Sequence, residues 1–465
     1  MAGIAGIASE GKTAQIKQML DRISHRGESG SKIIESHGST LGAVWLDAEA
    51  EPAPSMLRHQ AVWDGSRPPL PDQAALEEER DPFALTAATS EGMLLARDPL
   101  GVCPLYYGWT PEGDICFASE VKALLELADD IREFPPGTWY DDQGGFQTYF
   151  EVEPEPDLSQ DPERVARQLR LRLERAISRR VDEEATGCWL SGNLTSSALA
   201  ALARPRVEAL HTFAVGTPGT PDLDYARDVA ALLHTQHHEI TVTLDEVLEP
   251  LPAVIWHLES FDAALVRASV GRYLAAKRAA DHVGNLIFDE GANVLLSGSA
   301  HRREADARDL VEQTIQRAQT LHNTALQRVD RTASSHGLVA HIPFLDLDVF
   351  EYAISIPPEL KLRRNGVTID QWILRKALSS VLPADLLQPS DTDLWQGVGV
   401  GFLLALSAED QITDEEFYRE RVLPAGWTLH DKEELMYYRI FCEHFGELKD
   451  LTWMGRHTSG PELQP

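Results

Sequence analysis

Short apolar segments alternate with helical patterns in the middle of the chain, and this alternation limits the possible folds more than any other feature. The segments at 187–193, 211–217 and 238–244 are typical of short strands, and the first ends in a turn. Helical patterns at 196–203 and 225–234 follow the first two of these strands. Successive strand–helix units predict a parallel sheet flanked by helices, as in α/β proteins.

The remaining sequence divides into regions of different character. Residues 1–150 mix short apolar runs with Gly, Pro and Asp, which predicts a strand-rich domain with a few helices. The acidic, proline-rich stretch 151–163 is the best linker candidate. An amphipathic helix is predicted at 164–181, and helical patterns dominate the last part of the chain. A length of 465 residues is too great for one ordinary core, so we expect two domains, 1–150 and 151–465.

Composition disfavours several classes of partner. The formal net charge is -31, from 73 acidic and 42 basic side chains, which disfavours binding to nucleic acid or to an anionic membrane surface. The sequence has no run of eighteen apolar residues, and its N-terminus lacks the pattern of a secretory signal. The four cysteines form no CxxC pair and are expected to be reduced, which favours a cytoplasmic protein. They are Cys103, Cys116, Cys188 and Cys442.

Six motifs of the first 150 residues follow one another in the order found in one enzyme family. They are MAGIAGI at 1–7, SHRGESG at 24–30, VWDGS at 62–66, LLARDPLGVCPLYYG at 94–108, FASEVKAL at 117–124 and PPGTW at 135–139. Together they resemble the glutaminase half of glutamine-hydrolysing asparagine synthetases of the asparagine synthetase B type. The resemblance implies an Ntn-hydrolase-like, class II glutamine amidotransferase domain of αββα architecture. It also implies a C-terminal ATP-pyrophosphatase-like domain, in agreement with the predicted parallel sheet.

The resemblance sets Ala2 at the position of the family's nucleophile. In such enzymes a cysteine exposed by removal of the initiator Met attacks the glutamine amide, and a methyl side chain cannot do this. Asp64 stands where the family has an Asn that stabilises the oxyanion, and an ionised carboxylate would repel that charge. We therefore predict no glutaminase activity. The retained polar and aromatic residues are expected to hold a turn and pack the core, with a small-molecule site in the same pocket as the alternative. They are Arg97, Asp98, Gly101, Pro104, Tyr106 and Tyr107.

The segment 189–203 resembles the pyrophosphate loop of ATP pyrophosphatases, in which backbone N–H groups, hydroxyls and a helix N-terminus hold phosphates. Asn193 replaces a glycine of that loop, and Thr195 replaces the aspartate that holds Mg²⁺. Both changes argue against adenylation, and a capped helix start explains the local sequence equally well. The loop residues that match are Ser191, Gly192, Ser196 and Ser197, and the predicted adenine contacts on the next strand are Val215 and Gly216.

A second loop, at 287–299, resembles the family's loop for Mg²⁺, ATP and the substrate amine. Glu290, Gly291 and Ala292 are retained, but Asn293 and Val294 replace an Asp-Glu pair. Valine cannot ligate a cation or bind an ammonium group. Further changes affect charged residues of the family pattern: Val339, His341, Gln371, Gln388 and Ser390 replace a glutamate, an arginine, a lysine, an arginine and the essential lysine of the synthetase. The alignment at Ser390 is uncertain by one residue, but no lysine occurs between Lys376 and Lys432.

These observations lead to two hypotheses on function. The first is a non-catalytic homologue with a scaffold, regulatory or ligand-sensing role. The alternative is a diverged ATP-dependent amide-forming ligase, similar to β-lactam synthetases or to an ammonia-dependent asparagine synthetase. ATP and Mg²⁺ are cofactors only if the nucleotide loop still works. We expect no metal at His234, His237 and His238, where the family has an ordinary segment. Family analogy predicts a homodimer, and the sequence identifies no other partner.

Overall fold

The computed structural model describes residues 2–46, 61–66, 73–152, 161–296, 307–364, 368–387 and 399–457. Gln388 and Ser390, and residues 153–160 of the predicted linker, lie outside the described residues. Within these ranges, no helix is long and apolar enough to cross a membrane.

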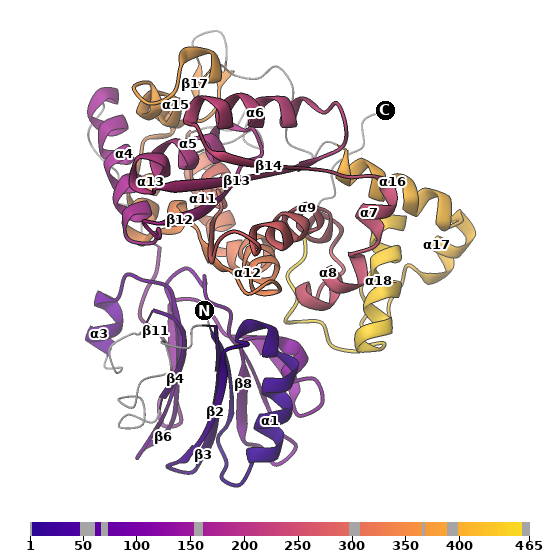
Figure 1. Ribbon diagram of the computed structural model, residues 1–465. Coiled ribbons are helices and arrows are strands. Elements are labelled where there is room, and N and C mark those ends of the chain that lie inside the picture. Colours follow the sequence, from indigo (N-terminus) through magenta and orange to yellow (C-terminus); the bar gives the residue numbers. More distant parts are fainter. Residues whose placement is uncertain are drawn as a thin grey trace.

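Two antiparallel sheets form the N-terminal part of the chain, drawn in indigo and purple (Figure 1). The first has the order β2-β3-β1-β8-β7-β9 and the second the order β11-β10-β6-β5-β4. Their strands are β1 (Ala2–Ile7), β2 (Gly30–Ser36), β3 (Ser39–Trp45), β4 (Ala61–Gly65), β5 (Phe83–Thr89), β6 (Gly92–Arg97), β7 (Tyr106–Trp109), β8 (Ile115–Ala118), β9 (Asp129–Glu133), β10 (Thr138–Asp141) and β11 (Gly145–Thr148). Apolar side chains from both sheets, including Ile4, Leu95 and Phe117, form one buried cluster, so the sheets pack face to face.

Helix α1 (Thr13–Arg22) covers the outer face of the first sheet, and α3 (Gln73–Glu78) belongs to the same part of the chain. The close approach of α1 depends on Gly42 of β3, because a Cβ atom there would lie 2.5 Å from Ile16 Cγ2. The strand-rich domain that the sequence predicts is therefore confirmed, with two sheets packed face to face and α1 on the outer face of the first.

The C-terminal part contains a five-stranded parallel sheet of order β14-β13-β12-β15-β16. Its strands are β12 (Ala185–Trp189), β13 (Ala209–Gly216), β14 (Gln236–Thr241), β15 (Asn285–Ile287) and β16 (Val339–His341). Helices α4 (Pro162–Ser178), α5 (Leu194–Ala203) and α6 (Pro221–Leu233) lie on one side of this sheet, whereas α9 (Ala263–Ala279) and α12 (Gln327–Ser334) lie on the other (Figure 1). The predicted strand–helix alternation is therefore confirmed. It could be predicted because apolar segments of strand length between helical patterns specify such layers locally.

The other elements are mostly helical. They are α7 (Leu244–Leu248), α8 (Leu251–Leu258), α10 (Ala292–Leu295), α11 (Ala307–Gln319), α13 (Leu347–Ser355), α14 (Pro358–Lys361), α15 (Trp372–Leu378), α16 (Val400–Gln411), α17 (Asp414–Glu420) and α18 (Lys432–Phe445), with the short strands β17 (Arg363–Arg364) and β18 (Thr368–Ile369). One buried apolar cluster joins α1 and β1 to α8, α9 and α18. The two parts of the chain therefore share a hydrophobic core at their junction.

Candidate functional site

Ala2 begins strand β1, and its surroundings are polar. The backbone N–H of Ala2 donates to Asp64 Oδ1 at 2.8 Å, and the backbone N–H of Gly65 donates to the same oxygen at 2.8 Å. The other oxygen of Asp64 accepts from Arg26 Nη2 at 2.8 Å. Asp64 is therefore held by one side-chain cation and two backbone donors, and only 3% of it is exposed.

Arg26 is completely buried, and each of its five N–H groups has a partner. Nε donates to the carbonyl of Ala2 at 3.1 Å, and the two terminal nitrogens bind both oxygens of Asp330 at 2.7 and 2.9 Å. The remaining donors reach Asp64 at 2.8 Å and Glu120 at 3.0 Å. Burial alone would lower the pKa of Arg26, but Asp330 and Asp64 raise it well above its ordinary value. The guanidinium is therefore permanently charged and links β1 and β4 to α12.

A wider group of charges continues from Arg26 across the junction of the two parts. Glu120 binds Arg331 at 3.2 Å and also contacts Lys122, while Arg331 binds Glu259 at 3.2 Å. Burial would raise the pKa of Glu120, but Arg331, His25 and Lys122 together hold it well below its ordinary value. We refer to Arg26, Asp64, Glu120, Lys122, Glu259, Asp330 and Arg331 as the junction network.

Cys103 lies beside Asp64 but does not offer a replacement nucleophile. A Cβ atom on Gly65 would lie 2.6 Å from Cys103 Sγ, which places the thiol next to this turn. Burial, followed by the charges of Asp64 and Asp98, raises the pKa of Cys103 well above its ordinary value. The thiol therefore stays protonated at neutral pH, and a protonated thiol is a poor nucleophile.

The retained motif at 94–108 forms a turn whose contacts fit the predicted structural role. Arg97 donates to the carbonyls of Cys103 at 2.8 Å, Gly101 at 3.0 Å and Phe134 at 2.7 Å. Asp98 accepts from three backbone N–H groups of the same turn. Gly101 has a φ of +66°, and a Cβ atom there would lie 2.8 Å from Pro136. Tyr106 and Tyr107 are buried.

The predicted nucleotide loop connects β12 to α5 at the carboxyl edge of the parallel sheet. Gly192 has a φ of +78°, and a Cβ atom there would lie 2.6 Å from the carbonyl oxygen of Asp222. Asn193 is the N-cap of α5, and its Oδ1 accepts from the backbone N–H of Ser196 at 2.8 Å. The hydroxyl of Ser197 donates to the carbonyl of Asn193 at 2.7 Å, and the backbone N–H of Ser191 donates to Ser196 Oγ at 3.2 Å. This is the capped helix start that the local sequence allows, and it occupies donors that a phosphate would otherwise bind.

Thr195 connects this loop to the second one. Its hydroxyl donates to Asp289 Oδ2 at 2.5 Å and lies 3.0 Å from Asn193 Oδ1. Burial and then the charge of Glu290 raise the pKa of Asp289, although hydrogen bonds from Thr195 and Asn193 act to lower it. Asp289 is not among the residues predicted from sequence, although it directly precedes Glu290 in the segment 287–299.

Glu290 is enclosed by two arginines. Arg272 of α9 donates to it at 2.5 Å, and Arg328 of α12 makes two hydrogen bonds of 3.0 and 2.7 Å. Burial would raise the pKa of Glu290, but Arg328 and Arg272 lower it. The carboxylate is therefore ionised, and the two guanidinium groups bind both of its oxygens. Sequence reasoning missed both arginines, because they come from segments far from residue 290.

The remaining predicted residues lie at or near the same edge of the sheet. Val215 and Gly216 end β13, next to the carboxyl end of β12. Gly291 has a φ of +82° and packs against Leu345, and Asn293 Oδ1 accepts from the side chain of Gln371 at 2.7 Å. The fold therefore gathers both predicted loops at the carboxyl edge of the sheet, the edge at which α/β proteins commonly bind ligands.

Comparisons with known proteins agree with this architecture. The family model described as asparagine synthase matches residues 168–316 and 302–454, and the model for a glutamine amidotransferase domain matches residues 76–126. A probable glutamine-hydrolysing asparagine synthetase of Schizosaccharomyces pombe is 35% identical over 391 residues, which cover 76% of this chain and 70% of that protein. Asparagine synthetase B of Escherichia coli is 32% identical over 384 residues, which cover 78% of this chain and 69% of that protein.

Proposed function

This chain belongs to the asparagine synthase family, and we propose that it is a non-catalytic member that keeps the fold for a scaffold, regulatory or ligand-sensing role. Both relatives named above are glutamine-hydrolysing asparagine synthetases by description. The proposal therefore depends on what this chain's own residues do at the two sites.

The observation that carries the proposal is the internal pairing of polar groups at the carboxyl edge of the parallel sheet. Thr195 offers a hydroxyl rather than a carboxylate and donates it to Asp289 at 2.5 Å. Both carboxylate oxygens of Glu290 are bound by the guanidinium groups of Arg272 and Arg328. Mg²⁺ in nucleotide sites is held by carboxylates with free oxygens and neutralises the leaving pyrophosphate. These residues do not fit such an ion, so we assign no reaction step to it.

The surroundings of Ala2 support the same proposal for glutamine hydrolysis. A methyl group replaces the nucleophile, and the nearby thiol of Cys103 has a raised pKa. The carboxylate of Asp64 lies where a developing negative charge would need donors, and it already occupies the backbone N–H of Ala2 and the side chain of Arg26.

One observation favours the alternative, a diverged ATP-dependent amide-forming ligase. Gly192 keeps the positive φ of a tight strand-to-helix turn, and three hydroxyl residues of the loop remain at the N-terminus of α5. A nucleotide could bind there if it displaced the side chain of Asn193 from its cap position.

The test combines binding with turnover. ATP affinity is measured by calorimetry with and without Mg²⁺, and pyrophosphate release is measured with ATP, ammonia and a panel of amino acids that includes aspartate. Glutamate production from glutamine is followed separately, with the Escherichia coli asparagine synthetase B as positive control. We expect no pyrophosphate and no glutamate above the background without protein. Pyrophosphate release that depends on any carboxylate would refute the proposal and support the ligase.

Two further proposals, on the oligomeric state and on the kind of non-catalytic role, are tested separately. Family analogy leads us to propose a homodimer, which light scattering after size-exclusion chromatography would reveal. ATP binding without turnover would favour a ligand sensor, whereas co-purification of another protein from the native source would favour a scaffold.

A further inference from the structure

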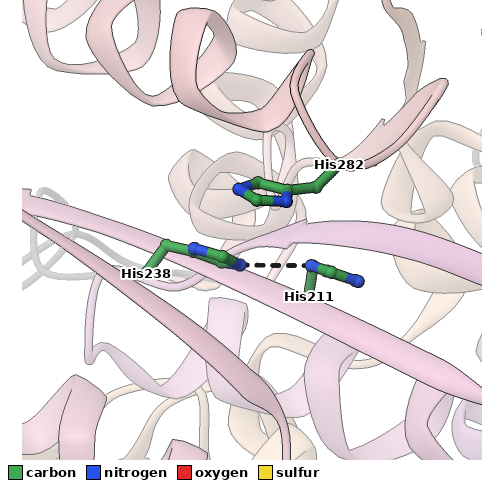
Figure 2. A group of neighbouring side chains, drawn as sticks. All are labelled: His211, His238 and His282. Carbon is green, nitrogen blue, oxygen red and sulfur yellow. Dashed lines mark hydrogen bonds between the residues drawn. The ribbon is translucent and has the colours of Figure 1, made fainter.

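Three histidines that are separate in the sequence meet on one face of the parallel sheet, away from the loops described above. His211 lies on β13, His238 on the edge strand β14, and His282 in the turn after α9. Figure 2 shows the rings of His211 and His238 side by side, joined by a hydrogen bond, with the ring of His282 above them. One ring nitrogen of each histidine lies within 4.8 Å of those of the other two. We call this group the histidine cluster.

The spacing of the nitrogens is close to that of imidazoles on one metal ion. His211 Nδ1 and His238 Nε2 are 3.1 Å apart. Two imidazoles that bind one tetrahedral zinc ion at 2.0–2.1 Å have nitrogens about 3.3 Å apart. His282 is exposed on a turn, so its ring can move the short distance that coordination requires. The rings of His238 and His282 are stacked, with centroids 4.3 Å apart and 28° between their planes, so the ring of His282 must also turn to direct a nitrogen lone pair at a shared ion.

The rings also have the protonation state that a metal ligand needs. Burial, followed by the charge of His282, lowers the pKa of His211. Burial and then the charges of His282 and His211 lower the pKa of His238 to about 4. Both imidazoles are therefore neutral at pH 7, and a neutral imidazole carries one lone pair that can bind a metal. Coordination would replace the hydrogen bond between them, and the donor ring would carry its proton on its other nitrogen.

The neighbouring groups hold one side of the cluster rigid and leave the other accessible. The ring of Phe213 stacks on His238 at 4.8 Å with an angle of 10° between the planes, and Phe213 is completely buried. Arg278 opposes a cation, because its charge contributes to the lowered pKa of His238. Its effect is moderated by Asp281, which lies 3.9 Å from it.

From this geometry we propose that the histidine cluster binds a divalent transition-metal ion of the Zn²⁺ class through three imidazole nitrogens, with water at the fourth position. Imidazole is a preferred ligand of Zn²⁺, and sets of three histidines with an open position are established zinc sites. The ion would fasten the turn after α9 to β13 and to the edge strand β14. This inference is independent of the nucleotide loop and of the proposed function.

From the sequence, no metal is predicted at His234, His237 and His238. The structure separates these three residues. His237 makes a hydrogen bond with Thr212, and His238 is the one residue of the three that belongs to the histidine cluster. Neighbours in a strand point to opposite faces, so His237 and His238 cannot serve the same ion.

The test uses the full chain purified without a histidine tag. Zn²⁺ affinity is measured by competition with a chromophoric chelator, and Co²⁺ is bound as a spectroscopic substitute. His282→Ala removes one exposed ligand. The matched control is His234→Asn, another exposed histidine near the sheet, whose left-handed φ of 51° asparagine tolerates. Loss of outer-sphere partners alone costs about 10–100-fold in metal affinity, so loss of a ligand should weaken binding at least about tenfold.

We expect stoichiometric Zn²⁺ binding that His282→Ala weakens and His234→Asn leaves unchanged, together with the visible absorption of four-coordinate Co²⁺. A second measurement does not depend on variants: Zn²⁺ should protect His238 and His282, but not His234, from diethylpyrocarbonate, as read by mass spectrometry. Absence of stoichiometric binding would overturn the proposal. So would equal affinity in the wild type and His282→Ala, or equal modification of the cluster with and without Zn²⁺.

Discussion

Replacement of Arg26 by methionine is the sharpest test of the junction network. The change keeps much of the side-chain volume but removes five donors and a buried positive charge. Glu120 keeps Arg331, and Asp330 also keeps Arg331, at 2.9 Å. Asp64 keeps only backbone donors, so its carboxylate is left buried without a counter-charge.

The expected cost follows from that isolated carboxylate. Removal of one partner of a buried ion pair typically costs about 3–5 kcal/mol, and we expect Arg26→Met to lower the free energy of unfolding by this amount. The matched control is Arg22→Met, because Arg22 pairs with Glu126 at 2.5 Å but both side chains are exposed, by 41% and 55%. An exposed pair contributes at most about 1 kcal/mol. Arg26→Met combined with Asp64→Leu should recover part of the loss, since it removes the isolated charge as well.

The assay is urea unfolding followed by circular dichroism, repeated across pH. Burial alone would raise the pKa of Asp330, but the charge and hydrogen bonds of Arg26, together with the charge of Arg331, hold the folded-state pKa below its ordinary value. The resulting stabilisation is present above the unfolded pKa of about 3.9 and is lost as pH falls through the folded-state pKa. The difference in the free energy of unfolding between wild type and Arg26→Met should therefore have its full size at neutral pH and become smaller in acid. A loss no larger than that of Arg22→Met, or a difference that grows in acid, would refute the reasoning.

The remaining predictions concern the nucleotide loop. Gly192→Ala should lower the melting temperature much more than the control Gly219→Ala. Both positions have φ near +80°, but only at Gly192 would the new Cβ meet a backbone oxygen, that of Asp222 at 2.6 Å. Equal shifts in a thermal melt would contradict this. Thr195→Asp should destabilise the chain at neutral pH by about 1–3 kcal/mol, because it replaces the hydrogen bond to Asp289 with a second buried carboxylate. Mg²⁺ should restore part of that loss if the pair can hold the ion, and a melting temperature unaffected by the substitution would show that Thr195 and Asp289 do not interact.

Much of the fold was predictable because its signals are local. The apolar segments and helical patterns between 187 and 244 predicted β12, α5, β13, α6 and β14, since strand and helix periodicities are written into neighbouring residues. The absence of a nucleophilic atom from the side chain of Ala2 also needs no structure. The resemblance placed the two loops in one family, and the comparisons confirmed that family.

The contacts that give the sites their character come from residues far apart in the chain. Arg26 binds Asp330, 304 positions away, and Glu290 lies between Arg272 and Arg328, from two different helices. No periodicity predicts such pairs, because they depend on which helix faces pack across the sheet. Asp64 illustrates the difference: from sequence it is an unfavourable negative charge, whereas in the fold it is the partner of Arg26.

The histidine cluster shows the same division. The sequence places His237 and His238 side by side, but strand geometry sends their side chains to opposite faces. Only the pairing of β13 with β14, and the return of the chain after α9, brings His211 and His282 to His238. The sequence by itself determined the layers and the chemical groups available in them. Tertiary packing decided which charges and ring nitrogens meet, because those encounters depend on distances that only the assembled layers set.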